Sequence, residues 1–472
     1  MDTCLLWFRR DLRLLDNPAL NWAIQNSKQI IALYIDDSEE DNPWRAGAAS
    51  RWWLHHSLQH LQQQLKAQGI ELQLLQGDSI STLEQVLEQT HATQLVFNHL
   101  YEPYYRQQAA QLQQQLQTRF ADRVTLQGFD SGLFFKPGSV LNNQQQPYRV
   151  YTPFYKKLRP LLDQHYSHYR VSRPQFTGDK SPALNQALPL EKLALLDTHP
   201  TPHPSPHSWH EKFNPVWSPG EAGAHQALEA FLEQPIMHYQ QQRDIPAING
   251  TSRLSASLHF GEITPQQIFL SLQPLLHGQG SDIDKNSIES FIKQLLWREF
   301  AHHVLWHFPH TQSQPMDNRY HNSFWKNDDA LLQQWQQGRT GIAIIDAGMQ
   351  QLWQTGWMHN RVRMICSSFL TKNLGLHWLQ GARWFWDTLV DANLANNTMG
   401  WQWVAGCGVD AAPYYRIFNP LTQSKRFDPN NRYTQQWLDT ESYTADATPL
   451  VDLSSSREAA LLRFKQHIKQ DG

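Results

Sequence analysis

The 472-residue chain has few cysteines and no apolar segment long enough to cross a membrane. Its three cysteines, Cys4, Cys366 and Cys407, lie far apart and form no CxxC pair. This spacing argues against a disulfide framework or a cysteine-rich zinc site and favours a reducing compartment. The first apolar run is shorter than that of a signal peptide, and charged residues follow it at once. We therefore expect a cytoplasmic protein that does not enter a membrane.

Several common cofactor motifs are also missing. No GxGxxG follows the first predicted strand and no GxxxxGK[ST] occurs, so we do not expect a standard dinucleotide or NTP domain. Four histidines recur at near-helical spacing, but no HExxH or suitably spaced carboxylate accompanies them. We interpret these residues as a packed or solvated face rather than a metal site: His302, His303, His307 and His310.

The chain also has no large excess of positive or negative charge, whereas aromatic side chains are abundant. The net charge of −3 gives no overall basic field, so a nucleic-acid-binding protein of this composition would need a local basic patch. The chain holds 19 Trp, 21 Phe and 15 Tyr, with Trp concentrated after residue 290. Most indoles fill cores, but flat rings also stack on flat ligands and can carry single electrons. The large number of aromatic residues is therefore a weak indication of a bound chromophore.

The hydrophobic pattern divides the chain into two halves and a connector. Residues 1–130 alternate apolar runs with helical patterns, which predicts an α/β domain with a doubly wound, Rossmann-like parallel sheet. Residues 216–472 show helical periodicity and are predicted to be all-α. The Pro-, Ser-, Thr- and His-rich stretch 131–215 is predicted to be an inter-domain connector with one helix near residues 152–163.

Individual elements can be predicted from the same patterns. The expected strands are Leu5–Phe8, Ile30–Ile35, Leu72–Leu75, Leu95–Asn98 and Val124–Leu126. The expected helices include Pro18–Ile24, Gly47–Gln68, Pro103–Phe120, Ala224–Leu232, Pro265–Leu272, Ser287–His307, Gly341–Gln351, Trp357–Leu374 and Ser456–Lys469. Asn17 is expected to cap the first helix, with Pro18 at its first position.

Two segments suggest contacts to anions. GTSRLSASLHF, which starts at Gly250, places hydroxyls and an arginine at the start of a predicted helix, where free N–H groups attract phosphate. The residues are Thr251, Ser252, Arg253 and Ser255, with Tyr239 and Arg243 just upstream. On its own this segment suits an ordinary helix cap about equally well. TGWMHNRVRM places Asn360, Arg361, Arg363 and Met364 on one or two helical turns, a suitable rim for a flat anionic substrate.

Residues 390–420, VDANLANNTMGWQWVAGCGVDAAPYYRIFNP, are far more distinctive. Together with WFRRDLRLLDNPAL, TSRLSAS, LLWREF, GRTGIAIIDAGMQQL and TGWMHNRVRM, this segment resembles the photolyase/cryptochrome family, and in particular the bacterial photolyases of cyclobutane pyrimidine dimers. The six motifs run in family order over nearly the whole chain. The resemblance implies an α/β antenna domain and a helical FAD-binding domain. It also implies blue-light-driven repair of dimers in DNA by electron transfer from reduced FAD to a flipped-out lesion.

By motif position, the resemblance also implies a cofactor site. The FAD-binding residues would be Tyr239, Thr251, Ser252, Arg253, Leu254, Ser255, Phe291, Arg298, Asn360, Arg363, Asp391, Asn393 and Asn397. Arg363 and Asp391 would form an ion pair over the isoalloxazine, and Asn397 would face flavin N5. Electrons would pass through Trp401, nearest the flavin, then Trp378, and finally an exposed Trp325.

The resemblance implies a lesion pocket and DNA contacts as well. Catalytic residues would be Trp297, Asn360, Met364, Trp403, Gln294 and Asn397. Arg243, Arg361 and Arg416 would contact phosphates around the opening. Many relatives carry Glu at the position of Gln294; the amide can donate a hydrogen bond but cannot supply a proton. The lesion type therefore stays open, although Asn360 and Arg361 stand where (6-4) enzymes place a histidine pair.

The second chromophore and two other functions also stay open. The antenna is implied to be a methenyltetrahydrofolate, which Asn98 and Glu102 favour, or a deazaflavin, for which Pro43–Arg45 could frame a pocket. A cryptochrome-type blue-light receptor would share the fold, the FAD and the tryptophan chain, and a (6-4) photolyase would differ in its lesion. A generic flavin oxidoreductase would need a nicotinamide site, for which no fingerprint occurs. We expect the protein to bind DNA that contains pyrimidine dimers. We also expect it to be a monomer.

Overall fold

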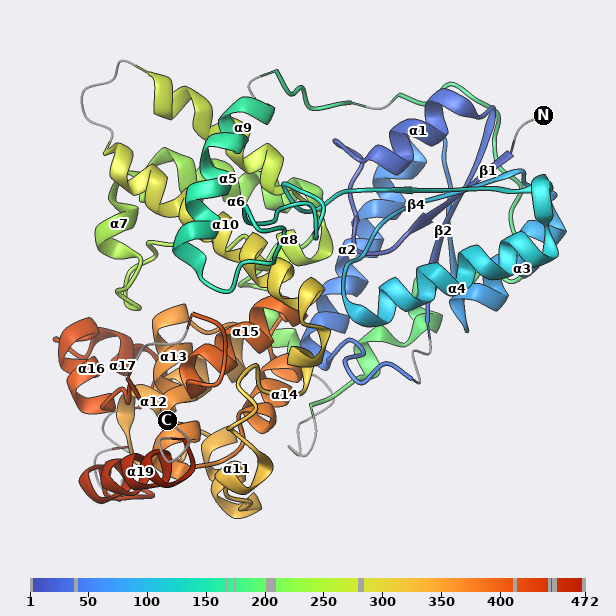
Figure 1. Cartoon of the computed structure of the whole chain (residues 1–472). Helices are drawn as coiled ribbons and strands as arrows, with labels where there is room; N and C mark the ends of the chain where they lie inside the picture. The colour runs from blue at the N-terminus through green and yellow to red at the C-terminus, as the bar shows by residue number, and fades with distance from the viewer. Residues whose placement is uncertain are drawn as a thin grey trace.

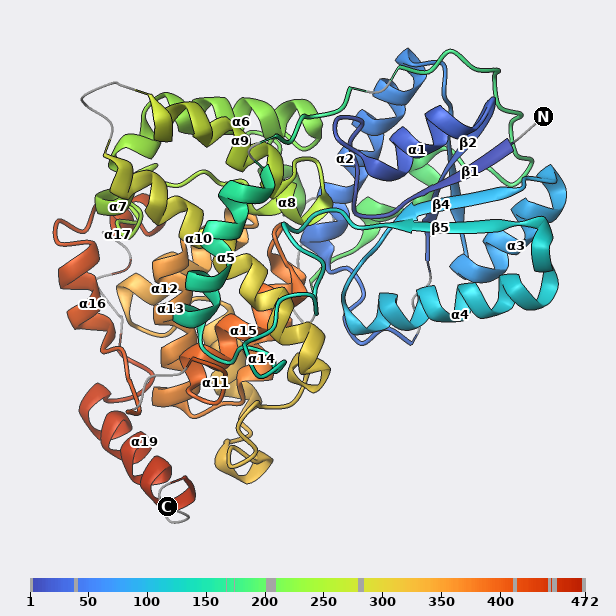
Figure 2. The same ribbon diagram turned by 45° about the horizontal axis from the view of Figure 1, so that its top comes forward.

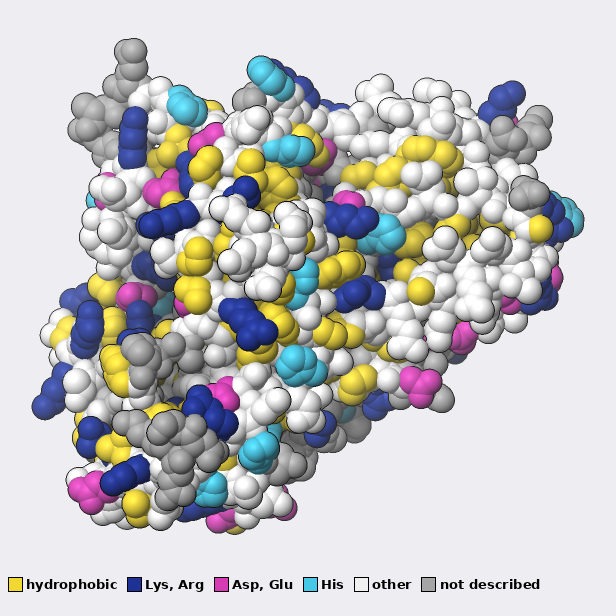
Figure 3. Space-filling view, viewed as in Figure 1, with side chains coloured by type: hydrophobic (Ala, Val, Ile, Leu, Met, Phe, Trp, Pro, Cys, Tyr) yellow, Lys and Arg dark blue, Asp and Glu magenta, His cyan; other side chains and the backbone are white. Residues whose placement is uncertain are grey.

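The computed structural model describes residues 3–37, 41–166, 168–173, 175–200, 209–278, 284–410, 414–439, 443 and 448–468. An α/β unit and a helical unit lie side by side (Figures 1 and 2). On the face in Figure 3, basic, acidic and uncharged side chains are interspersed. Among the described residues, none of the helices combines the length and hydropathy needed to cross a bilayer.

The α/β unit is a five-stranded parallel sheet with strand order β3-β2-β1-β4-β5. The strands are β1 (Thr3–Phe8), β2 (Gln29–Asp36), β3 (Leu72–Gln76), β4 (Gln94–Asn98) and β5 (Thr125–Phe129). The helices of this unit are α1 (Pro18–Asn26), α2 (Ala48–Ala67), α3 (Ser79–Thr90) and α4 (Pro103–Arg119). All five predicted strands are confirmed, and the predicted doubly wound α/β class with them.

Side-chain alternation along β1 explains why helices cover both faces of the sheet. Cys4, Leu6 and Phe8 pack with α1 and α2, whereas Leu5 and Trp7 pack with α3 and α4. The predicted cap of α1 is confirmed, since Asn17 accepts a hydrogen bond from Leu20 N at 3.1 Å and Pro18 occupies the first turn.

The other half of the molecule is helical, as predicted. Its α-helices are α5 (Tyr151–Tyr166), α6 (Glu221–Glu233), α7 (Tyr239–Gln242), α8 (Ser255–Phe260), α9 (Pro265–His277), α10 (Lys285–His307), α11 (Asp329–Gln336), α12 (Ala343–Thr355), α13 (Asn360–Ser368), α14 (Trp378–Thr388), α15 (Leu394–Ala405), α16 (Pro420–Phe427), α17 (Arg432–Trp437) and α19 (Leu453–His467). A π-helical turn, Phe369–Leu374, continues α13.

Helix α5 lies within the stretch 131–215, which the sequence suggested as a connector. Its buried residues Phe154, Leu158 and Leu162 share a core cluster with residues of α6, α9 and α10. By packing, α5 therefore belongs to the helical half. The division of the chain at residues 131 and 215 stays a prediction.

Helix α13 begins later than predicted. The sequence suggested one helix over 357–374, but Trp357 and Met358 precede α13 and lie outside it. Gly356 ends α12 at φ +65°, and His359 then caps α13 by accepting from Arg361 N at 3.2 Å. This cap, and not the hydrophobic pattern, sets where the helix begins.

Two buried carboxylates hold the halves together. Glu221 accepts from Leu14 N at 2.9 Å and Leu15 N at 2.8 Å, and Glu262 accepts from Trp53 Nε1 at 2.8 Å. Gly261 adopts φ +67° beside the loop that follows β1, where a Cβ would collide with the Arg10 carbonyl. The α/β unit is thereby fixed against α8, which lines the site described below.

The histidine-rich face of α10 is partly packed and partly solvated. His302 and His303 are buried, and burial lowers the pKa of each to about 3. His310 lies beyond α10 and is exposed. This agrees with the interpretation of these histidines as a packed or solvated face.

Candidate functional site

A cavity of about 590 Å³ opens between α7, α8, α10, α13 and α15. Most of the predicted site residues line it, although they come from distant segments of the chain. These are Tyr239, Arg243, Thr251, Ser252, Arg253, Leu254, Ser255, Phe291, Gln294, Trp297, Arg298, Asn360, Arg361, Arg363, Met364, Asp391, Asn393 and Trp403. Asn397, Arg416, Trp401, Trp378 and Trp325 are absent from this lining.

Arg253 supplies an unneutralised positive charge to this cavity. Its backbone adopts φ +52°, and its guanidinium lies 5.0 Å from the Trp357 ring and 6.0 Å from the Trp217 ring. Burial lowers its pKa, and no carboxylate of the described chain forms an ion pair with it. A half-buried cation of this kind is stabilised by an anion, so the residues present fit a diphosphate group such as that of FAD.

The predicted Arg363–Asp391 ion pair is confirmed. Arg363 Nη2 lies 2.9 Å from Asp391 Oδ2 and 3.1 Å from Oδ1, and Arg363 Nε donates to the Met358 carbonyl at 2.7 Å. Ser255 Oγ donates to Asp391 Oδ2 at 2.7 Å. Because Asp391 is 8% exposed, these contacts fix the start of α8 and one turn of α13 against the segment before α15.

Two amides take different positions near the start of α15. Asn393 lines the cavity and caps α15 by accepting from Asn396 N at 3.1 Å. Asn397 is half-buried and donates Nδ2 to the Ala382 carbonyl at 2.9 Å. One N–H of its Nδ2 therefore serves α14, and the predicted contact of Asn397 with flavin N5 stays a prediction.

The outer part of the cavity has aromatic walls and an amide between them. Trp297 of α10 and Trp403 of α15 contribute flat apolar surfaces. Gln294 lies one turn before Trp297; its Oε1 accepts from Arg243 Nη2 at 3.1 Å and its Nε2 donates to the Ser290 carbonyl at 3.1 Å. These contacts couple the Gln294 amide to a cation at the rim.

The rim carries basic side chains. Arg361 pairs with Asp244, with Nη2 at 2.8 Å from Oδ2, and donates Nη1 to Met364 Sδ at 3.9 Å. Asn360 Nδ2 also points to Met364 Sδ, at 3.9 Å. Arg416 is exposed, and its guanidinium lies 5.9 Å from the Trp403 ring. Arg416 therefore lies next to one aromatic wall although it does not line the cavity.

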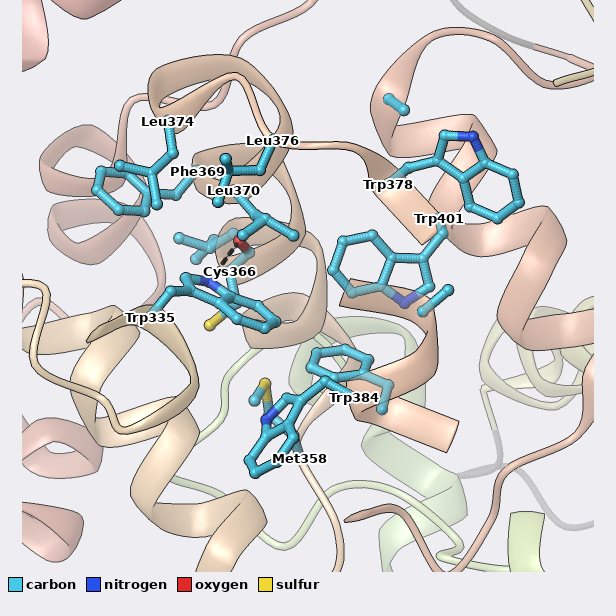
Figure 4. Close-up of a cluster of buried hydrophobic side chains, with 14 of the residues drawn as sticks. Trp335, Met358, Cys366, Phe369, Leu370, Leu374, Leu376, Trp378, Trp384 and Trp401 are labelled. Carbon is cyan, nitrogen blue, oxygen red and sulfur yellow. Dashed lines mark hydrogen bonds between the residues drawn. The ribbon is translucent and has the colours of Figure 1, made fainter. Parts of the chain in front are cut away.

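The three predicted electron-transfer tryptophans belong to one buried cluster, part of which Figure 4 shows. Gly381, one turn after Trp378, leaves space for the Trp401 indole, since a Cβ there would collide with it. The His377 ring connects the next pair, with centroids 5.8 Å from Trp378 and 5.3 Å from Trp325. The prediction that Trp325 is exposed is wrong: it is 8% exposed, packed against Tyr320, Phe324 and His377.

A second cavity, of about 500 Å³, lies where β1, β2 and β3 end. Ligands of open parallel sheets bind at this edge. Trp44, Arg45 and Glu102, three of the residues considered for the antenna, line it. Asn98 is buried instead and donates Nδ2 to Asn17 Oδ1 at 2.8 Å, so its amide serves the loop structure beside β4.

Trp357 is a site residue that the sequence did not reveal. Its ring lies 5.0 Å from the Arg253 guanidinium and 5.9 Å from that of Arg363. It thus orients both cations of the cavity. The sequence feature that could have identified Trp357 is its position in the motif TGWMHNRVRM, three residues before Asn360.

Comparisons with known proteins agree with this architecture. A family model described as DNA photolyase matches residues 4–173, and one described as the FAD binding domain of DNA photolyase matches residues 291–447. A deoxyribodipyrimidine photo-lyase of Agrobacterium fabrum is 37% identical over 434 residues, covering 92% of this chain and 86% of the relative. Cryptochrome-1 of Arabidopsis thaliana is 32% identical over 443 residues, covering 92% of this chain and 62% of the relative.

A solved structure shares nearly the whole fold. The crystal structure of a bacterial class III photolyase from Agrobacterium tumefaciens superposes with a TM-score of 0.88 at 34% identity, covering 99% of this chain and 98% of that one. With its parallel-sheet unit, its helical FAD-binding unit and these relatives, the chain belongs to the photolyase/cryptochrome family.

Proposed function

We propose that this protein uses blue light and FAD to split cyclobutane pyrimidine dimers in DNA. One observation carries the proposal: a single cavity joins a half-buried arginine without an ion-pair partner among the described residues, Arg253, to a pair of indole walls, Trp297 and Trp403. The first suits a diphosphate cofactor and the second suits two adjoining flat bases. The name of the Agrobacterium relative, deoxyribodipyrimidine photo-lyase, supports this reading.

FAD would be held by the inner part of the cavity. Arg253, Thr251 and Ser252 are proposed to contact its phosphates, and the Arg363–Asp391 pair its ring system. When bound and reduced, FAD supplies an electron that light releases. The protein contributes orientation and a site from which water is excluded.

The lesion would be held by the outer part of the cavity. Trp297 and Trp403 are proposed to enclose the flipped-out bases and exclude water around them, beside Met364 and Asn360. The Gln294 amide can donate to a base carbonyl as negative charge develops there. Arg243, Arg361 and Arg416 are proposed to contact the phosphates on either side of the flipped-out lesion.

The remaining roles rest on the same resemblance. We propose that Trp401, Trp378 and Trp325 pass electrons inward, with the His377 ring between the last two. Asn397 is proposed to use its free carbonyl oxygen toward the flavin. We also propose that residues 1–130 act as an antenna domain whose cavity beside Trp44 and Arg45 holds a folate or a deazaflavin. The protein is proposed to act as a monomer in the cytoplasm.

A comparison of three DNA duplexes tests the lesion assignment. The duplexes are identical except for a central cyclobutane dimer, a central (6-4) product or no lesion. Binding in the dark is measured by fluorescence anisotropy, and conversion of the damaged strand to the undamaged strand under blue light by chromatography. We expect preferential binding and splitting of the cyclobutane dimer. Splitting of the (6-4) product alone would identify the lesion as that product. No lesion preference, with FAD bound, would favour a cryptochrome-type receptor.

A further inference from the structure

Tyr151 covers the back of one indole wall. The Tyr151 and Trp297 rings are stacked, with centroids 3.6 Å apart and an angle of 11° between the planes. The Tyr151 hydroxyl donates to the Lys293 carbonyl at 2.8 Å, one turn before Trp297 on α10. Tyr151 is buried and does not line the cavity. One face of Trp297 is therefore occupied by protein, and its position depends on the first residue of α5.

A second set of contacts runs from Tyr151 to the opposite wall. The Tyr151 backbone N–H, unpaired within α5 because it begins the helix, faces the Asp410 carboxylate and acts to lower its pKa, against the larger raising effect of burial. The Asp410 carbonyl in turn accepts from Trp403 Nε1 at 3.0 Å. Asp410 adopts φ +54°, which an aspartate tolerates only at some cost in conformational energy. The two indole walls are thus connected through two residues on separate segments.

We propose that Tyr151 and Asp410 form a brace that sets the separation of Trp297 and Trp403 for a pair of fused pyrimidines. Both are positioning residues, since neither lines the cavity. The inference rests on the proposed function, because it treats the space between the walls as the lesion pocket. The brace fixes α10 and α15 relative to each other before DNA arrives, so little conformational freedom is lost on binding.

The same contacts also suit a purely structural role, with Tyr151 as a core residue and Asp410 as a cap of α5. The two roles differ in what they predict for DNA. A structural residue affects the fold and hence all ligands alike. A brace affects the affinity for a dimer more than the affinity for undamaged DNA, because phosphates outside the cavity supply most of the latter.

Four single variants separate these roles. Tyr151→Phe keeps the stacked ring and removes only the hydroxyl, whereas Tyr151→Leu removes the stack. Asp410→Asn keeps a side-chain acceptor, and Asp410→Gly removes it while relieving the positive φ. Each holoenzyme is titrated in the dark with a duplex containing one cyclobutane dimer and with the same duplex without it. Flavin content and Tm are recorded for every variant.

We expect Tyr151→Leu and Asp410→Gly each to lower the ratio of the two affinities by about two- to tenfold. Tyr151→Phe and Asp410→Asn should stay within about twofold of the wild type. The variant with both Tyr151→Leu and Asp410→Gly should lose little more than Tyr151→Leu alone, since the contacts belong to one unit.

Equal losses for damaged and undamaged DNA would overturn the brace, and so would additive losses in the double variant. An unchanged ratio in Asp410→Gly, which leaves the core intact, would overturn it even if Tyr151→Leu failed to fold. A wild-type protein that does not distinguish the dimer from undamaged DNA would instead refute the proposed function. The two failures are therefore distinguishable.

Discussion

We expect Arg253 to have two opposite effects on the stability of the protein, depending on whether an anion is bound. Without an anion, its half-buried charge destabilises the helical half; with a diphosphate present, it supplies charge-assisted hydrogen bonds. We expect Arg253→Gln to weaken FAD binding by about ten- to hundredfold and yet to raise the Tm of the apoprotein. FAD fluorescence titration and thermal unfolding of the apoprotein measure the two effects.

Arg123→Gln serves as the control, because Arg123 is exposed on the α/β unit. It should change neither quantity. If Arg253→Gln bound FAD as tightly as the wild type, the diphosphate site would have to be placed elsewhere in the cavity.

The uncharged side chain of Gln294 affects the electrostatic surroundings of Arg243 as well as those of the lesion. As a neutral amide it adds no charge beside Arg243, whose Nη2 lies 3.1 Å from Gln294 Oε1 and whose Nε lies 3.9 Å from Asp244 Oδ1. Gln294→Glu would place a carboxylate there and form an ion pair. We expect the slope of log Kd against log salt concentration for undamaged DNA to fall by about one in this variant. Gln294→Met is the matched neutral control. An unchanged slope in Gln294→Glu would show that Arg243 does not contact DNA.

Individual residues were predictable from the sequence only where a motif contained them. Arg363 and Asp391 are far apart in the chain, but each belongs to a motif, and their ion pair was predicted. Tyr151 was not, because its contact with Trp297 joins two segments without a shared pattern. The burial of Trp325 was missed for a related reason, since three neighbouring rings cover it and no local pattern reports them.

At the scale of elements, α13 carries Asn360, Arg361, Arg363 and Met364. Its cap is His359, whose Nδ1 must be unprotonated to accept from Arg361 N. Burial lowers the pKa of His359 to about 4; the nearby Asp244 charge acts against this shift, and the Arg363 and Arg361 charges act with it. Since the pKa in the folded state lies below the ordinary value near 6.5, this histidine contributes stability that is present above pH 6.5 and lost toward pH 4.

We therefore expect His359→Asn, which keeps a capping acceptor but does not titrate, to reduce the loss of stability over this pH window by up to about 3 kcal/mol. Urea unfolding at several pH values between about 7 and 4 measures it. Other buried histidines titrate in both proteins and cancel in the difference. Parallel curves for the two proteins would contradict the role of the cap.

Strands were more predictable than helix boundaries. Short runs of Leu, Ile and Val are typical of buried parallel strands, and all five predicted strands were found. The start of α13 depends on one cap and on the positive φ of Gly356, which hydrophobic periodicity does not contain. The packing of α5 on α10 likewise depends on tertiary contacts.

For the whole molecule, the net charge of −3 conceals a local arrangement of cations around the cavity. If Arg243, Arg361 and Arg416 contact phosphates, log Kd for undamaged duplex should rise with log salt concentration with a slope of about two to three. Arg416→Gln should lower that slope by about one without changing flavin content, since Arg416 lies outside the cavity lining. A slope near zero in the wild type would contradict the basic rim.

The central claim is that this cavity holds a cyclobutane dimer beside FAD and that light splits it. The most direct measurement is the recovery of thymine absorbance when the purified protein, with its flavin reduced, is illuminated with blue light together with ultraviolet-irradiated oligothymidine. We expect recovery in the light, none in the dark, and several dimers split per flavin. No recovery in the light, with reduced FAD fully bound, would contradict it.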